Sequence, residues 1–122
     1  MKVLAWDIGT RTLSYCAVTI NEDDLSITVD PTQWGIIDLI TEEMSDIPEK
    51  SYTMEQFNIA LIKAVKKRDY VYGTLFDEVV IEQQPAGGHN KFACVTMKIL
   101  SHALYTWYLL EHTPPSLGFI SP

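Results

Sequence analysis

The chain has 122 residues, of which 47% are hydrophobic, enough for one domain with a buried core. Its net charge of −7 argues against a protein that coats nucleic acid, because such proteins are usually basic. No apolar run approaches the ~20 residues that span a membrane. Asp7 interrupts the N-terminal apolar run that a signal peptide would need, so we expect an intracellular protein. Two cysteines without metal-binding spacing predict neither a disulfide framework nor a zinc site.

The first forty residues read as strands. Residues 2–6 are an apolar run followed by an acid and then Gly9, which is typical of a buried strand that enters a turn. Residues 13–20 are rich in β-forming residues and precede a polar turn. Two further strand-like pieces, 25–29 and 33–40, are separated by Pro31. Short turns between neighbouring strands predict an antiparallel meander.

A loop and a helix follow the meander. Residues 41–52 are acidic and polar, and we expect a loop there. Thr53 and Gln56 have the spacing of a capping box, which predicts that a helix begins at this point. Gly73 is the expected terminator of that helix.

The last part of the chain alternates strand and helix. Residues 77–82 predict a short buried strand that ends in an acid. A longer helix is expected from about Asn90 to Glu111, followed by a strand over 117–120. The order βββ-α-β-α-β predicts an α/β fold with a mixed sheet, in which a three-strand antiparallel meander is followed by parallel crossovers.

The helix over 90–111 carries apolar residues on more than one face, so it must be covered on two sides. In a domain this small, we expect the second cover to be another subunit. Our interpretation is that one apolar row forms a homodimer contact. That row consists of Met97, Leu100, Leu104 and Tyr108.

Two of the expected strands end in acids, Asp7 and Glu82. Parallel neighbouring strands bring their carboxyl ends together, where open α/β sheets place their ligands. Two carboxylates there repel each other, and a bound Mg²⁺ or Mn²⁺ would relieve that repulsion. Two such ions can activate water for phosphodiester cleavage. The alternative stays open that Asp7 caps a turn and Glu82 makes a salt bridge at the sheet edge.

Three stretches carry a resemblance to a known family. AWDIGTRTLSYCAV resembles the first motif of RuvC-like nucleases, in which an apolar strand delivers an Asp before Gly-Thr and a returning strand. DEVVIEQQP resembles the second motif, in which an apolar strand delivers a Glu. NKFACVTMKILSHALYTWYLLE is similar to the helix that follows in Holliday junction resolvases of poxviruses and other large DNA viruses.

The resemblance implies an RNase H-like nuclease domain over 1–122, with Asp7 and Glu82 as catalytic and metal-binding residues. It implies Mg²⁺ or Mn²⁺ as cofactor, two ions per site, and a homodimer that cuts opposed strands of a four-way DNA junction. A viral protein of this kind would act in the host cytoplasm. Members of the family complete the site with two acids on a final helix. This sequence ends before such a helix, so we expect a C-terminally incomplete domain that binds metal poorly by itself.

Five polar residues near the expected site are candidates for DNA contacts. Arg11 lies in the first turn, and the others follow Glu82 or lie in the next helix; they are Gln83, Asn90, Lys91 and Lys98. For Arg11 the competing interpretation is an ordinary solvated arginine, and for Gln83 it is a side chain that holds Glu82 in place. The basic segment from Lys63 to Arg68 is more simply explained as a solvated helix face than as a DNA patch.

Two other functions remain open. An ATP-binding protein of the actin and sugar-kinase group can also have Asp-x-Gly-Thr in its first phosphate loop. Such proteins have a second glycine-rich loop after another Asp, whereas here the corresponding strand ends in Glu82-Gln-Gln-Pro. The third hypothesis is an RNase H-like remnant that binds DNA or a partner without catalysis.

Overall fold

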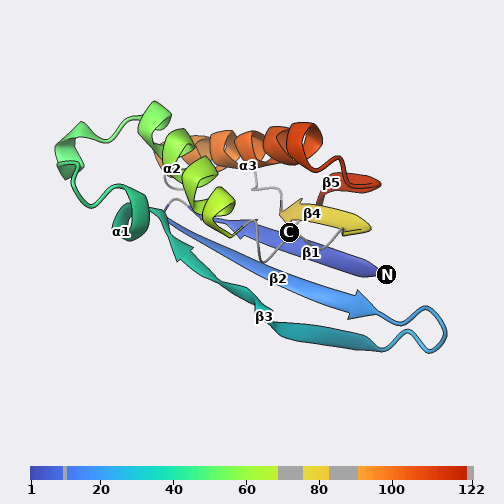
Figure 1. Ribbon diagram of the computed structural model, residues 1–122. Helices are drawn as coiled ribbons and strands as arrows, with labels where there is room; N and C mark the ends of the chain where they lie inside the picture. The colour runs from blue at the N-terminus through green and yellow to red at the C-terminus, as the bar shows by residue number, and fades with distance from the viewer. Residues whose placement is uncertain (10, 69–75, 83–90, 121–122) are drawn as a thin grey trace.

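The computed structural model (Figure 1) describes residues 1–9, 11–68, 76–82 and 91–120, with all of their side chains except those of residues 30, 31 and 91–94. Five strands form one mixed sheet in the order β3-β2-β1-β4-β5. Its antiparallel part is the predicted meander, β1 (Lys2–Ile8), β2 (Thr12–Ile20) and β3 (Ile27–Asp38). Its parallel part adds β4 (Glu78–Glu82) beside β1 and β5 (Ser116–Ile120) beside β4. The predicted fold class is therefore confirmed.

Strand β3 is continuous, so the prediction of two separate pieces was wrong. The register between β2 and β3 shifts between the Cys16–Trp34 pair and the Val18–Val29 pair. Pro31 falls in this irregular stretch. Because β3 lies at the edge of the sheet, a proline there deprives no second neighbour of a backbone donor. The bulge therefore accommodates the proline that suggested a break.

The segment 41–52, predicted to be a loop, contains helical structure. Helix α1 (Leu39–Glu43) begins directly after β3, and a 3₁₀ turn covers Glu49–Ser51. Asp38 caps α1, because its side chain accepts a hydrogen bond from the backbone N–H of Thr41. Two of the acids that suggested a loop, Glu42 and Glu43, therefore belong to a short capped helix.

Helix α2 (Met54–Lys67) begins where the sequence predicted. Thr53 accepts a hydrogen bond from the backbone of Gln56, and the Gln56 side chain accepts one from the backbone of Thr53, which completes the capping box. The helix ends at Arg68. The predicted terminator, Gly73, lies outside the described residues.

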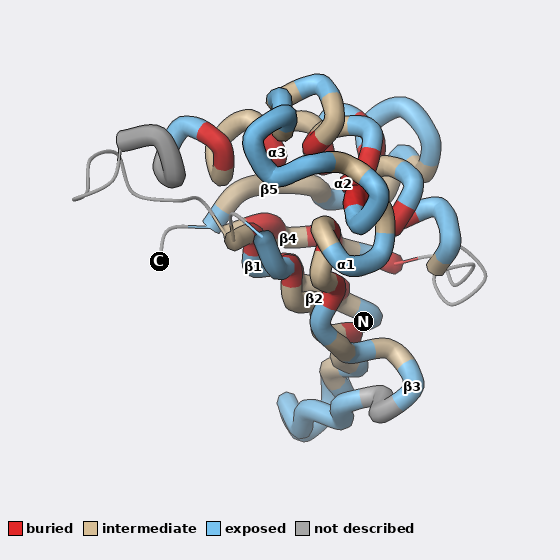
Figure 2. Tube along the Cα trace, turned by 90° about the vertical axis from the view of Figure 1, so that its left-hand side faces the viewer, coloured by how far each residue is buried: buried red, intermediate tan, exposed pale blue. Residues whose placement is uncertain are grey.

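Helices α2 and α3 (Lys91–Glu111) cover one face of the sheet, and the buried residues lie between these two layers (Figures 1 and 2). In the described residues no helix covers the opposite face. There Trp34 is 57% exposed and Ile36 is 71% exposed. Within the same residues, no helix is long and apolar enough to cross a membrane. The sheet therefore has one packed face and one open face.

The predicted homodimer contact on α3 was wrong for three of its four residues. Leu100, Leu104 and Tyr108 are buried in the core of a single chain, and Met97 is half-buried. The sheet covers one side of α3 and α2 lies beside it, where Ala60 and Ala64 are buried. The sequence requires α3 to be covered on two sides, and both of the elements that cover it belong to the same chain.

A buried hydrogen bond ties α3 to the central strand. The indole Nε1 of Trp6 donates to the hydroxyl of Tyr108 over 2.9 Å. We expect Tyr108→Phe to lower the free energy of unfolding by about 1–3 kcal/mol, because the buried indole N–H loses this acceptor. Tyr105→Phe is the matched control, since Tyr105 lies on the same helix and stacks on Phe119 by its ring. Urea denaturation followed by circular dichroism measures both, and equal losses would contradict the assignment.

Candidate active site

The alternation of side chains along β1 and β4 decides where the two acids point. Leu4, Trp6 and Ile8 of β1 are buried against the helices, so Asp7 lies on the open face of the sheet. In β4 the buried residues are Val79 and Ile81, which places Glu82 on the same face. Parallel pairing of Trp6 with Ile81 brings the following residues, Asp7 and Glu82, to the same level of adjacent strands.

The two carboxyl groups are in contact. A hydrogen bond with Asp7 raises the pKa of Glu82 above its ordinary value, and burial and the charge of Asp7 act in the same direction. Asp7 is exposed and Glu82 is half-buried. The structure thus brings together the two acids that lie 75 positions apart in the sequence, in a contact that favours the protonated form of Glu82.

The pair lies in an open hollow of about 410 Å³ on the helix-free face. Ser14, the β2 partner of Asp7, lines it beside the acids. Trp34 and Ile36 of β3 and Ile120 of β5 form its apolar walls. A polar patch on the central strands is therefore bordered by exposed apolar side chains.

The donor set fits a hard divalent cation. Two adjacent carboxylates offer oxygen ligands, and a cation would stabilise the ionised form of Glu82, which the hydrogen bond with Asp7, burial and the charge of Asp7 all disfavour. In the described residues, no cluster of three or more His, Cys, Asp and Glu side chains could hold a metal. An ion at Asp7 and Glu82 would therefore need oxygens from water, substrate or other parts of the chain.

The turn after β1 requires a glycine. The backbone N–H of Gly9 donates to the carbonyl of Thr12 over 2.9 Å. A Cβ atom added at Gly9 would lie 2.6 Å from that carbonyl oxygen, which is too close for any other residue. The glycine closes the turn tightly and returns the chain as β2, so that Ser14 pairs with Asp7.

The structure places two of the five candidates for DNA contacts. Arg11 is exposed beside the tight turn, and its Nε donates to both carboxylate oxygens of Asp38. Lys98 is half-buried on α3. Gln83 and Asn90 lie outside the described residues, as does the side chain of Lys91. Asp38 was not among the predicted site residues; its signal in the sequence is its place three residues before Thr41, the spacing of a helix cap.

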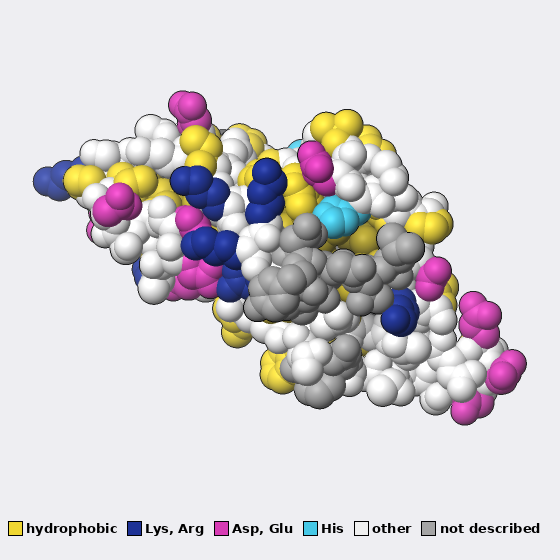
Figure 3. Space-filling view, in the orientation of Figure 1, with side chains coloured by type: hydrophobic (Ala, Val, Ile, Leu, Met, Phe, Trp, Pro, Cys, Tyr) yellow, Lys and Arg dark blue, Asp and Glu magenta, His cyan; other side chains and the backbone are white. Residues whose placement is uncertain are grey.

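Two members of the basic segment Lys63–Arg68 are paired within the chain. Lys67 pairs with Glu43 of α1, and an Nη of Arg68 contacts Glu42 at 2.5 Å. Hydrogen bonding to Glu42 raises the pKa of the Arg68 guanidinium. Figure 3 shows Lys and Arg side chains gathered beside Asp and Glu in this region. The pairs join α2 to α1, in agreement with the simpler interpretation of the segment.

We expect Glu82→Gln to stabilise the metal-free protein. Because the pKa of Glu82 is raised in the folded state, the native protein binds more protons than the unfolded chain, and its stability falls as the pH rises through that pKa. The variant does not lose this stability, because glutamine has no carboxyl group to ionise. Its gain should be roughly 1 kcal/mol or less at neutral pH, since the pair is partly solvated, and should vanish at about pH 4.

The measurement is the melting temperature in the presence of chelator, at pH values from about 4 to neutral. Glu78→Gln is the matched control, because Glu78 lies on the same strand and is also half-buried, but it is four residues from Glu82. A gain for Glu82→Gln that does not depend on pH would show that the two carboxyl groups do not interact.

Comparison with solved structures identifies the fold. RuvC of T. thermophilus in complex with Holliday junction substrate matches with a TM-score of 0.66 and 11% sequence identity, over 100% of this chain and 66% of that one. The yeast mitochondrial Holliday junction resolvase Ydc2 matches with a TM-score of 0.70 and 20% identity, over 98% and 50%. The fowlpox virus Holliday junction resolvase matches with a TM-score of 0.55 and 13% identity, over 100% and 63%.

The chain thus spans between half and two thirds of the length of these three proteins. No protein-family model and no curated protein matches the sequence. At these identities the likeness concerns the path of the backbone. The chain has the RNase H-like fold of the RuvC-type Holliday junction resolvases.

Proposed function

We propose that this chain is part of a divalent-metal-dependent endonuclease that cleaves branched DNA inside the cell. The observation that carries the proposal is the contact between Asp7 and Glu82 on the open face of a RuvC-like sheet. Two carboxylates at the carboxyl ends of adjacent parallel strands form a site for Mg²⁺ or Mn²⁺ and not for a neutral ligand. Hydrolysis of a phosphodiester is the chemistry that such a site supports best.

Asp7 and Glu82 would hold the cation, as two of the ligands of a site that takes two ions in the complete protein. When bound, the metal supplies a nucleophilic water and neutralises charge on the phosphate. Glu82 would bind the cation in its ionised form, so binding should strengthen as the pH rises through the raised pKa of Glu82. The strands keep the carboxylates in place, since their neighbours Trp6 and Ile81 are fixed in the core.

The proposed substrate is a four-way DNA junction. The T. thermophilus RuvC that this chain resembles in fold was solved with a Holliday junction substrate. Symmetric cleavage of two opposed strands would require two active sites, so the proposal includes a homodimer. The contact between its subunits does not involve Leu100, Leu104 or Tyr108, because these residues are buried within one chain.

The test uses the full product of the natural reading frame and a synthetic four-way junction. We expect cleavage in Mg²⁺ or Mn²⁺ and none in chelator. Asp7→Asn and Glu82→Gln should each lower kcat by a factor of about 100 or more while leaving junction binding within a few-fold, since DNA affinity rests mainly on phosphate contacts elsewhere. Product bands and their symmetry are followed on denaturing gels.

Glu78→Gln is the control for the loss of one acidic charge on β4, and it should cleave at the wild-type rate. Calorimetric titration with Mn²⁺ gives a second readout, in which Glu82→Gln should lose heat that Glu78→Gln keeps. Cleavage by Asp7→Asn at the wild-type rate would refute the metal site. Wild-type protein that binds the junction without cutting it would favour the non-catalytic alternative.

A further inference from the structure

An arginine and an aspartate form an ion pair beside the proposed site. The Nε of Arg11 lies 3.2 Å and 3.1 Å from the two carboxylate oxygens of Asp38. The Arg11 side chain is 56% exposed and that of Asp38 is 33% exposed. An ion pair this open to solvent, formed by an exposed arginine and a partly exposed aspartate, is usually worth little to stability. The pair is therefore better explained by where it holds the guanidinium than by what it adds to the fold.

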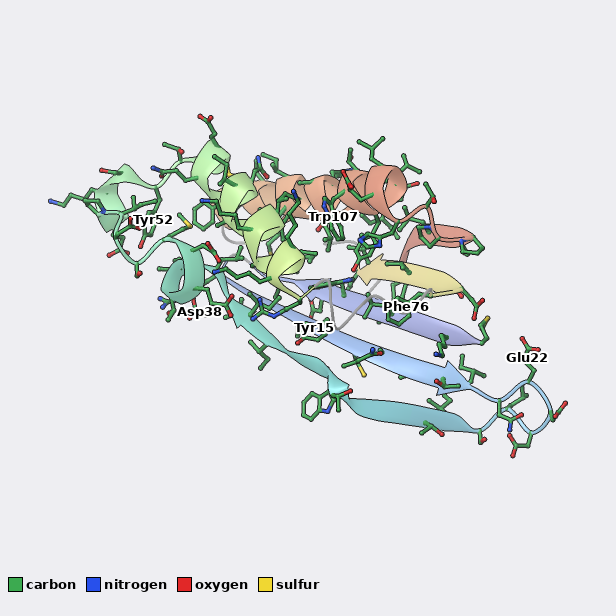
Figure 4. All side chains as sticks on the ribbon, in the orientation of Figure 1. Tyr15, Glu22, Asp38, Tyr52, Phe76 and Trp107 are labelled. Atoms are coloured by element: carbon green, nitrogen blue, oxygen red, sulfur yellow. The ribbon has the colours of Figure 1, made fainter. Side chains whose placement is uncertain are left out.

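Asp38 is a fixed acceptor. Its Oδ1 also accepts the backbone N–H of Thr41 over 3.1 Å at the start of α1, and Figure 4 shows it at that end of the sheet. This hydrogen bond is the largest cause that lowers the pKa of the Asp38 carboxyl, followed by that from Arg11, so the group stays ionised. The backbone also joins the two segments, because the N–H of Leu39 donates to the carbonyl of Arg11 over 3.1 Å. Both ends of the pair are thus anchored.

Among the described residues, the pair leaves the other edge of the guanidinium without a partner. Only Nε of Arg11 bonds to Asp38, and in the described residues neither Nη atom has a hydrogen-bond partner. The two Nη groups form the fork with which arginine binds a phosphate through two parallel hydrogen bonds. A carboxylate that occupies Nε restricts the rotation of this fork and so lowers the entropy that phosphate binding would cost.

Asp38, which holds Arg11, lies at the same end of the sheet as Asp7 and Glu82. Asp38 pairs with Thr12, two residues beyond the level at which Asp7 pairs with Ser14. With ~3.3 Å per residue and ~4.8 Å between strands, Asp38 lies about 7 Å along the strands and about 10 Å across them from Asp7. A DNA strand that passes the two acids can therefore reach Arg11 with a neighbouring phosphate.

From this geometry we propose that Asp38 is a positioning residue that holds Arg11 in place. Arg11 then binds a phosphate of the strand being cut, adjacent to the phosphate that lies at Asp7 and Glu82. This inference rests on the proposed function. It predicts that Asp38, although negative, strengthens binding of DNA. A carboxylate that merely neutralised Arg11 would weaken it.

The experiment separates the two roles of Asp38. Asp38→Ser keeps an oxygen that can cap α1, but the short side chain no longer reaches Arg11. Asp38→Asn keeps both the cap and a neutral acceptor for Nε. Arg11→Ala removes the fork, and Lys50→Ala removes an exposed positive charge from the 3₁₀ turn as a matched control. Melting temperatures close to that of the wild type show that each variant is folded.

Binding and cleavage of the four-way junction are measured at several salt concentrations. Arg11→Ala and Asp38→Ser should each raise KM about tenfold with kcat nearly unchanged. Each should also make the slope of log K for DNA binding against the logarithm of the salt concentration shallower by about 0.9, the value for one phosphate contact. The double variant should be no worse than either single one. Asp38→Asn should bind the junction within about threefold of the wild-type affinity. Lys50→Ala should bind it as tightly as the wild type.

Stronger binding by Asp38→Ser than by the wild type would overturn the inference, because Asp38 would then only neutralise Arg11. Additive effects of Arg11→Ala and Asp38→Ser would overturn it as well. Both outcomes leave cleavage by the wild type intact, so they do not touch the proposed function. A wild type that neither binds nor cuts branched DNA would instead refute the proposed function, and this inference with it.

Discussion

The parallel pairing of β1 with β4 is the constraint on which the site depends. Trp6 and Ile81 pair across these strands and are buried under the helices. Because side chains alternate along a strand, the next residues on both strands, Asp7 and Glu82, must emerge together on the opposite face. A slip of one residue would turn an acid into the core and an apolar residue out of it. The packing of the hydrophobic face therefore fixes the register of the acidic pair and keeps the two carboxyl groups side by side.

Much of this arrangement could be predicted from local patterns. The apolar run before Asp7, the one before Glu82 and the capping box at Thr53 are signals confined to a few residues, and the structure has strands and a helix at these places.

The errors concern interactions between distant segments. Pro31 suggested a break because the sequence does not tell that β3 is an edge strand. The apolar surface of α3 suggested a second subunit because periodicity shows that a helix is covered, but not that α2 of the same chain covers it. The pairing of Arg11 with Asp38 likewise depends on a strand register that the sequence does not reveal.

The distribution of charge also bears on the negative net charge of the chain. Three acids, Glu22, Asp23 and Asp24, lie in the loop between β2 and β3, at the end of the hairpin opposite to α1 (Figure 4). Hydrogen bonds from Ser26 lower the pKa of Asp24, so its charge persists in weak acid. Part of the excess negative charge is thus placed away from the carboxyl ends of β1 and β4, and its field is screened over about 10 Å at ordinary salt concentrations. A net charge of −7 is therefore compatible with an anionic substrate at the open face.

The three tryptophans differ in their exposure to solvent, so their fluorescence reports on different parts of the molecule. Trp6 lies in the core and Trp107 is 9% exposed in the helix layer, whereas Trp34 is 57% exposed on the face that holds the acids. Emission from Trp34 is therefore red-shifted relative to the other two and is the part that a soluble quencher such as iodide reaches. A nucleic acid or polypeptide that fills the hollow at Asp7 and Glu82 would also cover the indole of Trp34, which lines the same hollow. The intrinsic fluorescence of this chain thus reports occupancy of its open face without any attached dye.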